Sequence, residues 1–336
     1  MRPRQETPLR ARRLNFRLPL SVYTFMTRTM TLVALLLLRG GLLHAQSIQN
    51  QIVERKSVEL PAFESIKEIA RYADPAEYQE AQADAGFSYE RLLYRSGDAI
   101  VSGYLYSPKG LPAQKLPAIV FSRGNYVVNN QAPVLVTMMR RLARKGFIVF
   151  APMFRGSDGI PGHDEMGGAD LQDLRSTIDL VESLPAVDAK NVYLYGESRG
   201  AMMTYFALRE DWPFRAAAIF GGLTEIGEYL NTIDPEGKFA ASIWPDYATK
   251  KDEILYARSA INWPEKIRKP ILIMHGGADE GVSPLHSLKM AEALTRLKRE
   301  YALVIFADDN HTISRNRNAR DKLAVDWFRQ HTAATK

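Results

Sequence analysis

From residue 89 onward, short apolar segments alternate with longer amphipathic segments. Two segments of alternating polar and apolar residues, 89–95 and 100–106, flank a Ser-Gly-Asp turn and predict an antiparallel strand pair. Further strand-like runs lie at 118–122, 147–152, 192–196, 216–220, 271–275 and 302–307, and helix-like stretches lie at 133–144, 169–184, 201–209, 283–299 and 313–331. This alternation predicts an α/β fold in which a mainly parallel, eight-stranded sheet carries helices on both faces.

The pattern changes at two places. Residues 46–86 are polar and acidic, with helical spacing over 63–78, and are interpreted as an N-terminal extension that packs on the domain. About fifty residues separate the strands at 216–220 and 271–275, and connections this long in compact domains usually form lids or binding loops. We therefore expect a cap insertion at about 222–268.

The expected cap is rich in aromatic residues, namely Tyr229, Phe239, Trp244 and Tyr247. In open α/β sheets, ligands bind beyond the carboxyl ends of the strands, where an insertion at this point would overhang the site. Trp244 and Tyr247, together with Tyr126 from an earlier loop, are therefore candidates for substrate contact. The alternative is that the cap aromatics only pack against the rest of the domain.

Charge and composition narrow the function classes. The whole chain carries a formal charge of +6, but residues 1–45 carry +7 of it, which leaves −1 for the remainder. A near-neutral body gives no reason to expect a nucleic-acid partner, which requires clustered Lys and Arg. The chain contains no cysteine, which excludes disulfides, thiol chemistry and a lipid-anchored cysteine.

Residues 1–45 are interpreted as a cleavable signal peptide. Arg28 precedes the apolar run 32–38, and Leu43 and Ala45 suit the −3 and −1 positions of a cleavage site. The basic segment ahead of the run is long, so translation is expected to start further along, at one of two internal methionines (Met26 or Met30).

The leader also predicts a location. Its apolar run is short and interrupted by Arg39, so it does not fit a transmembrane helix. We expect a periplasmic or secreted protein without stable membrane insertion after cleavage. An uncleaved membrane anchor is the alternative.

The most specific local pattern is Gly-Glu-Ser-Arg-Gly at 196–200. It follows an apolar strand and opens a helix, which is the structural context that G-x-S-x-G requires. Ser198 would sit on a strained turn that lifts its hydroxyl off the sheet, and the flanking glycines allow close backbone approach. The following helix start directs free N–H groups and a positive dipole end at the reaction centre. Ser198 is therefore the candidate nucleophile.

A serine hydroxyl needs a base, and the base needs an orienting carboxylate. On this fold, the order along the chain is Ser, acid, His. Five histidines lie outside the leader: His163, His275, His286, His311 and His331. His311 alone lies in a polar loop directly after a strand late in the chain, and Asp279 lies in the exit loop of the preceding strand. Glu280 is the alternative acid.

The chain resembles the catalytic domain of the prolyl oligopeptidase family and, more distantly, dienelactone hydrolases. The resemblance covers roughly 87–332 and rests on the segments 155–159, 167–173 and 275–284. It implies an α/β-hydrolase fold with a catalytic domain at 87–336. It also implies a serine-type peptidase that forms an acyl-enzyme and uses neither metal nor cofactor.

The resemblance assigns further roles. The backbone N–H groups of Asn125 and Arg199 would form the oxyanion hole. The alternative is that Arg123 pairs with an acid and Asn125 only caps a turn. Arg155 and Asp173 are interpreted as a structural pair that fixes the loop ahead of the nucleophile.

Two departures from the family pattern keep the substrate open. Only about forty residues stand between the leader and the first strand, too few for the family's β-propeller, and 122–126 replaces its oxyanion segment. The substrate is expected to be a short peptide or a small-molecule ester. The alternatives are a carboxylesterase and a catalytically inactive exported binding protein. The sequence does not indicate an oligomeric state.

Overall fold

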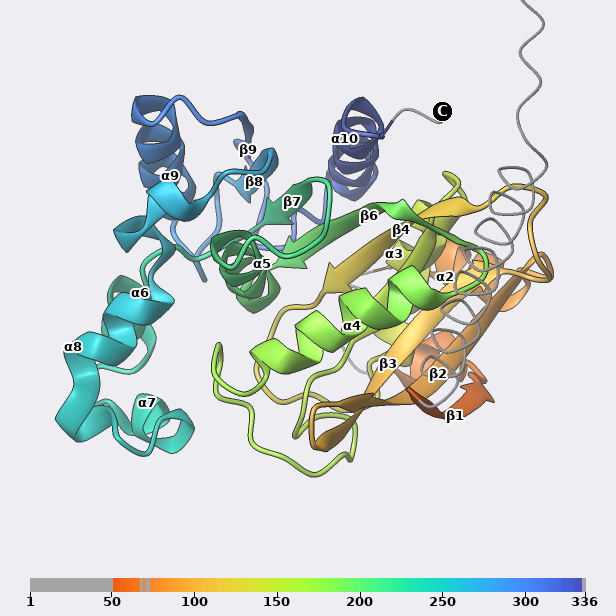
Figure 1. The fold of residues 1–336 in the computed structure, drawn as a ribbon, viewed down its shortest axis with the longest axis horizontal. Helices are drawn as coiled ribbons and strands as arrows, with labels where there is room; N and C mark the ends of the chain where they lie inside the picture. The colour runs from red at the N-terminus through yellow and green to blue at the C-terminus, as the bar shows by residue number, and fades with distance from the viewer. Residues whose placement is uncertain (1–50, 67–68, 70–72, 334–336) are drawn as a thin grey trace, which may run out of the picture. The chain divides into compact units, whose positions relative to one another are not determined.

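The computed structural model describes residues 51–66, 69 and 73–333. The predicted leader therefore lies outside the described residues. The strands are β1 (Ile52–Ser57), β2 (Phe87–Ser96), β3 (Ala99–Pro108), β4 (Leu116–Ser122), β5 (Ile148–Pro152), β6 (Val187–Glu197), β7 (Ala217–Phe220), β8 (Ile271–Gly276) and β9 (Tyr301–Phe306). They form one sheet in the order β1-β2-β3-β5-β4-β6-β7-β8-β9, shown in Figure 1.

The sheet is mainly parallel, as the sequence predicts. The pairs from β5 through β4 to β9 are parallel, whereas β1, β2 and β3 are joined antiparallel. The prediction of eight strands is wrong by one, because β1 adds an edge strand from within the expected extension. Most β1 side chains are polar and exposed, so the strand lacks the apolar alternation by which the others are recognised.

Helices cover both faces of the sheet. They are α2 (Pro75–Gln82), α3 (Ala132–Ala143), α4 (Leu171–Ser183), α5 (Arg199–Arg209), α9 (Leu285–Arg296) and α10 (Arg317–Gln330). Side chains of α4, α5 and α9 join one apolar cluster, and those of α2, α3 and α10 join the other. Alternate residues of β6 divide between the clusters, with Leu194 in the first and Tyr195 in the second.

The connection between β7 and β8 folds into three helices, α6 (Ile226–Ile233), α7 (Lys238–Ile243) and α8 (Tyr247–Arg258). They are grouped together in Figure 1, in cyan and teal. Two short 3₁₀ turns, Ala260–Asn262 and Pro264–Lys266, lead from them into β8. Within the part of the chain that is described, no helix has the length and apolar character needed to cross a membrane.

Candidate active site

Ser198 occupies a strained turn between β6 and α5. Its φ and ψ are 52° and −117°, a conformation that residues with a side chain rarely adopt. A Cβ on Gly200 would lie 1.8 Å from the backbone oxygen of Ser122, and one on Gly196 would lie 2.6 Å from the Gly200 oxygen. Backbone therefore approaches the turn so closely that both positions require glycine.

Asp279 and His311 are brought together from the loops that follow β8 and β9. His311 Nδ1 lies 2.7 Å from Asp279 Oδ2. Because a carboxylate only accepts hydrogen bonds, Nδ1 carries the proton, and the neutral ring keeps Nε2 as an acceptor. Asp279 Oδ1 accepts the backbone N–H groups of Gly281 and Val282, each at 2.9 Å. The acid is thus fixed from both of its oxygens.

His275 is a further partner of the acid that sequence reasoning treated as a structural residue. It is fully buried at the end of β8, and its Nε2 lies 3.0 Å from Asp279 Oδ2 and 2.9 Å from the Val282 carbonyl oxygen. Both partners are acceptors, so Nε2 donates, and Nδ1 accepts from Ser287 Oγ at 2.7 Å. His275 therefore orients the carboxylate that orients His311.

The electrostatics of this group favour a charged acid beside a basic imidazole. Burial would raise the pKa of Asp279, but hydrogen bonds from His275 and His311 hold it well below its usual range. Burial would lower the pKa of His311, but the hydrogen bond to Asp279 and its charge, together with the charge of Glu197, raise it above 6.5. His311 is accordingly tuned to take up a proton.

Ser198 lies beside this pair and beside the loop after β4. A Cβ on Gly124 would lie 3.3 Å from Ser198 Cβ, and one on Gly221, the residue after β7, would lie 3.0 Å from His311 Cε1. Among the described residues, the ring of His311 is hydrogen-bonded to Asp279 and not to Ser198 Oγ. In apo structures such bonds often form only once substrate is bound.

The loop after β4 is held from inside by Arg123. Its guanidinium is buried and donates to the carbonyl oxygens of Gly124, at 2.8 Å, and of Tyr126, at 3.0 Å, as well as to Ser157 Oγ. Burial lowers the pKa of Arg123 to about 9. Asn125 has a φ of 63°, and its N–H donates to no described protein group, nor does the N–H of Arg199.

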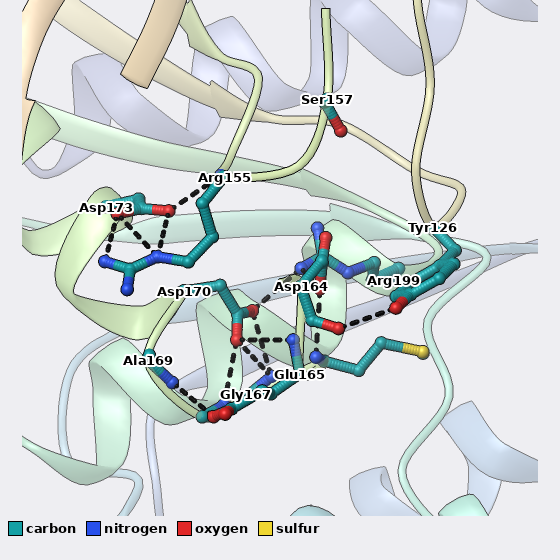
Figure 2. A network of polar contacts seen from close by, with 12 residues as sticks. Tyr126, Arg155, Ser157, Asp164, Glu165, Gly167, Ala169, Asp170, Asp173 and Arg199 are labelled. Carbon is teal, nitrogen blue, oxygen red and sulfur yellow. Dashed lines mark hydrogen bonds and ion pairs between the residues drawn. The ribbon is translucent and has the colours of Figure 1, made fainter. Parts of the chain in front are cut away.

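Figure 2 shows that the side chain of Arg199 is clamped by two buried carboxylates. Its Nη2 lies 2.6 Å from Asp164 Oδ1 and 2.8 Å from Asp170 Oδ2. Asp170 also accepts backbone N–H groups of the loop before α4, including that of Gly168 at 2.9 Å. The residue after Ser198 is therefore held against this loop by its side chain.

The pairing of Arg155 with Asp173, expected from sequence, is present in the same view. The guanidinium Nη2 lies 2.8 Å from Asp173 Oδ1, and the backbone N–H of Arg155 also donates to this carboxylate. Asp173 is fully buried. The pair fixes the start of α4 against the loop that follows β5.

The cap aromatics divide into two kinds. Trp244 and Tyr247 are only 4% and 9% exposed and pack on each other, and the indole of Trp244 donates to the Glu165 carbonyl oxygen at 2.6 Å. Phe239 is half-buried and makes an edge-on contact with Tyr126 of the loop after β4, with ring centroids 5.8 Å apart. This geometry favours packing for Trp244 and Tyr247, and their substrate contact stays a prediction.

The remaining candidates make no hydrogen bond to Ser198, Asp279 or His311 within the described ranges. Glu280 is exposed, whereas Asp279 is buried against its partners. His286 is buried on α9 and lies 3.4 Å from Thr224 Oγ1. His163 contacts a carbonyl oxygen of the cap. No group of three or more His, Asp or Glu among the described residues is arranged to hold a metal ion.

Residues 134–335 match the prolyl oligopeptidase family model. The chain is 25% identical over 230 residues to an uncharacterized peptidase, YtmA, of Bacillus subtilis (strain 168), covering 68% of this chain and 88% of that protein. It is 26% identical over 211 residues to acylamino-acid-releasing enzyme 2 of Oryza sativa subsp. japonica, covering 56% of this chain and 27% of that enzyme.

Solved structures share the fold. The acylaminoacyl peptidase of Pyrococcus horikoshii has a TM-score of 0.60 at 21% identity, covering 76% of this chain and 43% of that one. A puromycin-hydrolysing peptidase of Mycobacterium tuberculosis has a TM-score of 0.65 at 18% identity, covering 75% and 41%. The chain spans less than half the length of the rice enzyme and of both solved proteins.

Proposed function

The chain belongs to the prolyl oligopeptidase family, and from this premise we propose that it is an exported serine peptidase that cleaves short peptides through an acyl-enzyme. Ser198 is the proposed nucleophile, His311 the base and Asp279 the orienting acid. The observation that carries this assignment is the 2.7 Å contact between His311 Nδ1 and Asp279 beside the strained turn of Ser198.

Acylation follows from these positions. His311 Nε2 accepts the hydroxyl proton as Ser198 Oγ attacks the carbonyl carbon of the substrate. Negative charge then develops on the carbonyl oxygen, and the N–H groups of Arg199 and Asn125 are the proposed donors that stabilise it. The depressed pKa of Asp279 keeps this carboxylate charged opposite the imidazolium. The imidazolium returns the proton to the leaving amine as the bond to it breaks.

Deacylation repeats the steps with water as the nucleophile. His311 takes a proton from the water that attacks the acyl-enzyme, and the tetrahedral intermediate collapses to release the acid and Ser198. Besides the substrate and water, the steps use only side chains and backbone N–H groups of the chain.

The choice of a peptide substrate is supported by the relatives, which include enzymes named acylamino-acid-releasing enzyme and acylaminoacyl peptidase. A carboxylesterase remains the second candidate, because the oxyanion segment at 122–126 departs from the family pattern. A panel of N-acylated amino-acid p-nitroanilides measured beside p-nitrophenyl esters separates the two. A kcat/KM for every anilide that is negligible beside the esters would favour the esterase.

A fluorophosphonate probe tests the nucleophile directly. The wild-type protein should be labelled, and Ser198→Ala should lose both labelling and turnover by several powers of ten while remaining folded. Labelling of the alanine variant at the wild-type rate would refute the assignment. Failure of the wild-type protein to react would favour an inactive binding protein.

Export is proposed from the leader sequence alone. The protein expressed in an exporting host should accumulate outside the cytoplasm with a mature start near Gln46 or Ser47, which intact mass spectrometry would reveal. A mass that retains residues 26–45 would instead identify an uncleaved anchor.

A further inference from the structure

A small pocket rich in arginine lies directly beside the proposed triad. It is bordered by Asn125 of the oxyanion loop, by Glu197 immediately before the nucleophile and by Thr312 immediately after His311. Its free volume of about 40 Å³ suits a small terminal group rather than a bulky side chain. The proposed mechanism leaves this pocket without a role.

Four guanidinium groups line the pocket, and most of them are already engaged. Arg141 and Arg320 share the buried carboxylate of Asp321, and Arg123 binds the carbonyl oxygens of the oxyanion loop. Arg317, the first residue of α10, has one ion-pair partner in the described part of the chain, Glu77 at 3.7 Å, and Glu77 is held more closely by Arg141, at 3.1 Å. Of the four arginines, Arg317 therefore has the weakest contact with a carboxylate or carbonyl oxygen.

Unmet hydrogen-bond donors add to this excess of positive charge. Nη1 of Arg317, the atom that faces Glu77 at 3.7 Å, and Nε of Arg123 are buried without a hydrogen-bond partner among the described residues. Among the described residues that line the pocket, Glu197 is the one carboxylate beside four arginines. Burial raises the pKa of Glu197, which weakens its ability to neutralise the pocket. A planar guanidinium binds a carboxylate through two parallel hydrogen bonds.

The position of the pocket indicates which end of a substrate would reach it. None of its lining residues comes from the cap at 222–268; they belong to the oxyanion loop, Gln131 and the helix α3 that follows it, the end of β6, Phe220 and the segment 312–320. His311 delivers the proton to the leaving group, so the leaving group departs on the side of this histidine. The pocket therefore faces the leaving group rather than the acyl group.

We propose that this pocket binds the free carboxylate of the leaving group, so that the enzyme releases a C-terminal amino acid from short acylated peptides. Arg317 is the residue that recognises this carboxylate. The inference rests on the proposed serine peptidase function and names its substrate class.

The test compares substrates that differ only in the leaving-group carboxylate. Furylacryloyl dipeptides with a free C-terminus are measured beside the same dipeptides as C-terminal amides, following cleavage of the same bond. The wild-type kcat/KM should favour the acid by about tenfold or more, as expected from one charge-assisted pair. Arg317→Gln should reduce that preference toward unity, chiefly through the KM for the acid.

The matched control is Arg296→Gln on α9, whose side chain is 78% exposed and lies outside the pocket; it should keep the wild-type preference. Equal kcat/KM for acid and amide in the wild type would overturn the inference, as would an equal loss on both substrates in Arg317→Gln. The wild-type comparison does not depend on the folding of a variant.

A second pair of substrates tests whether the pocket instead binds a carboxylate on the acyl side of the substrate. Succinyl and acetyl amino-acid p-nitroanilides differ by a carboxylate on the acyl side, and the wild-type enzyme should not prefer the succinyl compound. A succinyl preference would place the acid site on the acyl side and overturn the inference. If acetyl anilides are cleaved in a Ser198-dependent manner without any preference for the dipeptide acid, the proposed function stands and only the inference fails.

Discussion

Replacement of Asp170 by Asn tests the ion pair that holds Arg199, the residue after Ser198. The carboxylate of Asp170 is fully buried and accepts from Arg199 Nη2 at 2.8 Å, from Gly168 N at 2.9 Å and from Gly167 N at 3.0 Å. Asparagine has nearly the same shape but turns one of these acceptors into an N–H₂ donor. That donor would face either the guanidinium or the backbone N–H groups, all of which donate.

The expected loss in the free energy of unfolding depends on the contacts that Arg199 keeps in the variant. Removing one partner of a buried ion pair costs about 3–5 kcal/mol. Arg199 keeps its 2.6 Å contact with Asp164, so we expect a loss near the lower end, about 3 kcal/mol. Against a typical total stability of about 5–15 kcal/mol, this loss is readily measured. The fold should therefore survive with a clearly lowered unfolding midpoint.

Urea unfolding followed by circular dichroism measures this loss, provided that the m-value is unchanged. Asp179→Asn is the matched control, since Asp179 lies on α4 in an exposed i,i+4 pair with Arg175 and should cost less than about 1 kcal/mol. If Asp170→Asn costs no more than Asp179→Asn, the carboxylate is not a buried clamp and the reasoning fails.

Three further predictions concern the turn, the base and the cap. Gly200→Ala should abolish fluorophosphonate labelling, because the new Cβ would lie 1.8 Å from a backbone oxygen of the oxyanion loop; labelling at the wild-type rate would contradict this. A plot of kcat/KM against pH should fall at acid pH with an apparent pKa above 6.5, because protonated His311 cannot accept a proton. Asp279→Asn should move this acid-side fall to lower pH, because the variant lacks the charge that raises the pKa of His311. An acid-side fall at the same pH in the variant would refute the pairing. Trp244→Ala should lower the free energy of unfolding by about 3–5 kcal/mol, because its ring is buried. Phe239→Ala should instead change kcat/KM unequally across a series of acyl lengths at nearly constant stability. The reverse pattern would show that Trp244, and not Phe239, is the substrate contact.

The sequence predicted the sheet well because most strands leave a clear hydrophobic signal. Every residue of β5 is buried, and β6 alternates between two apolar clusters, so both follow from the residue pattern alone. The edge strand β1 leaves no such signal, because pairing with β2 through backbone hydrogen bonds requires no apolar side chain. Its place in the sheet could be recognised only from the fold.

The candidate site also has a part that the sequence predicts and a part that it does not. The turn at Ser198 is encoded locally, since two glycines and a strand-to-helix change identify it. The part played by His275 is not local, because it depends on how the loop after β8 folds back to place Asp279 against the ring. In the sequence, nothing distinguishes the cap aromatic residues that are buried from those that are not. Trp244 is buried and Phe239 is half-buried because of how α7 and α8 pack, which the residue pattern does not reveal.

The loop that clamps Arg199 also anchors the cap. The Glu165 carbonyl oxygen accepts from Trp244 Nε1 at 2.6 Å and from Arg258 Nη2 at 3.3 Å, and the Met166 carbonyl oxygen accepts from Arg258 Nε at 3.0 Å. A rigid opening of the cap would break all three bonds, at a net cost of about 0.5–1.5 kcal/mol each as the freed groups become hydrated. The same loop carries Asp164 and Asp170, which bind Arg199, so the cap and the residue after Ser198 are held by one shared segment.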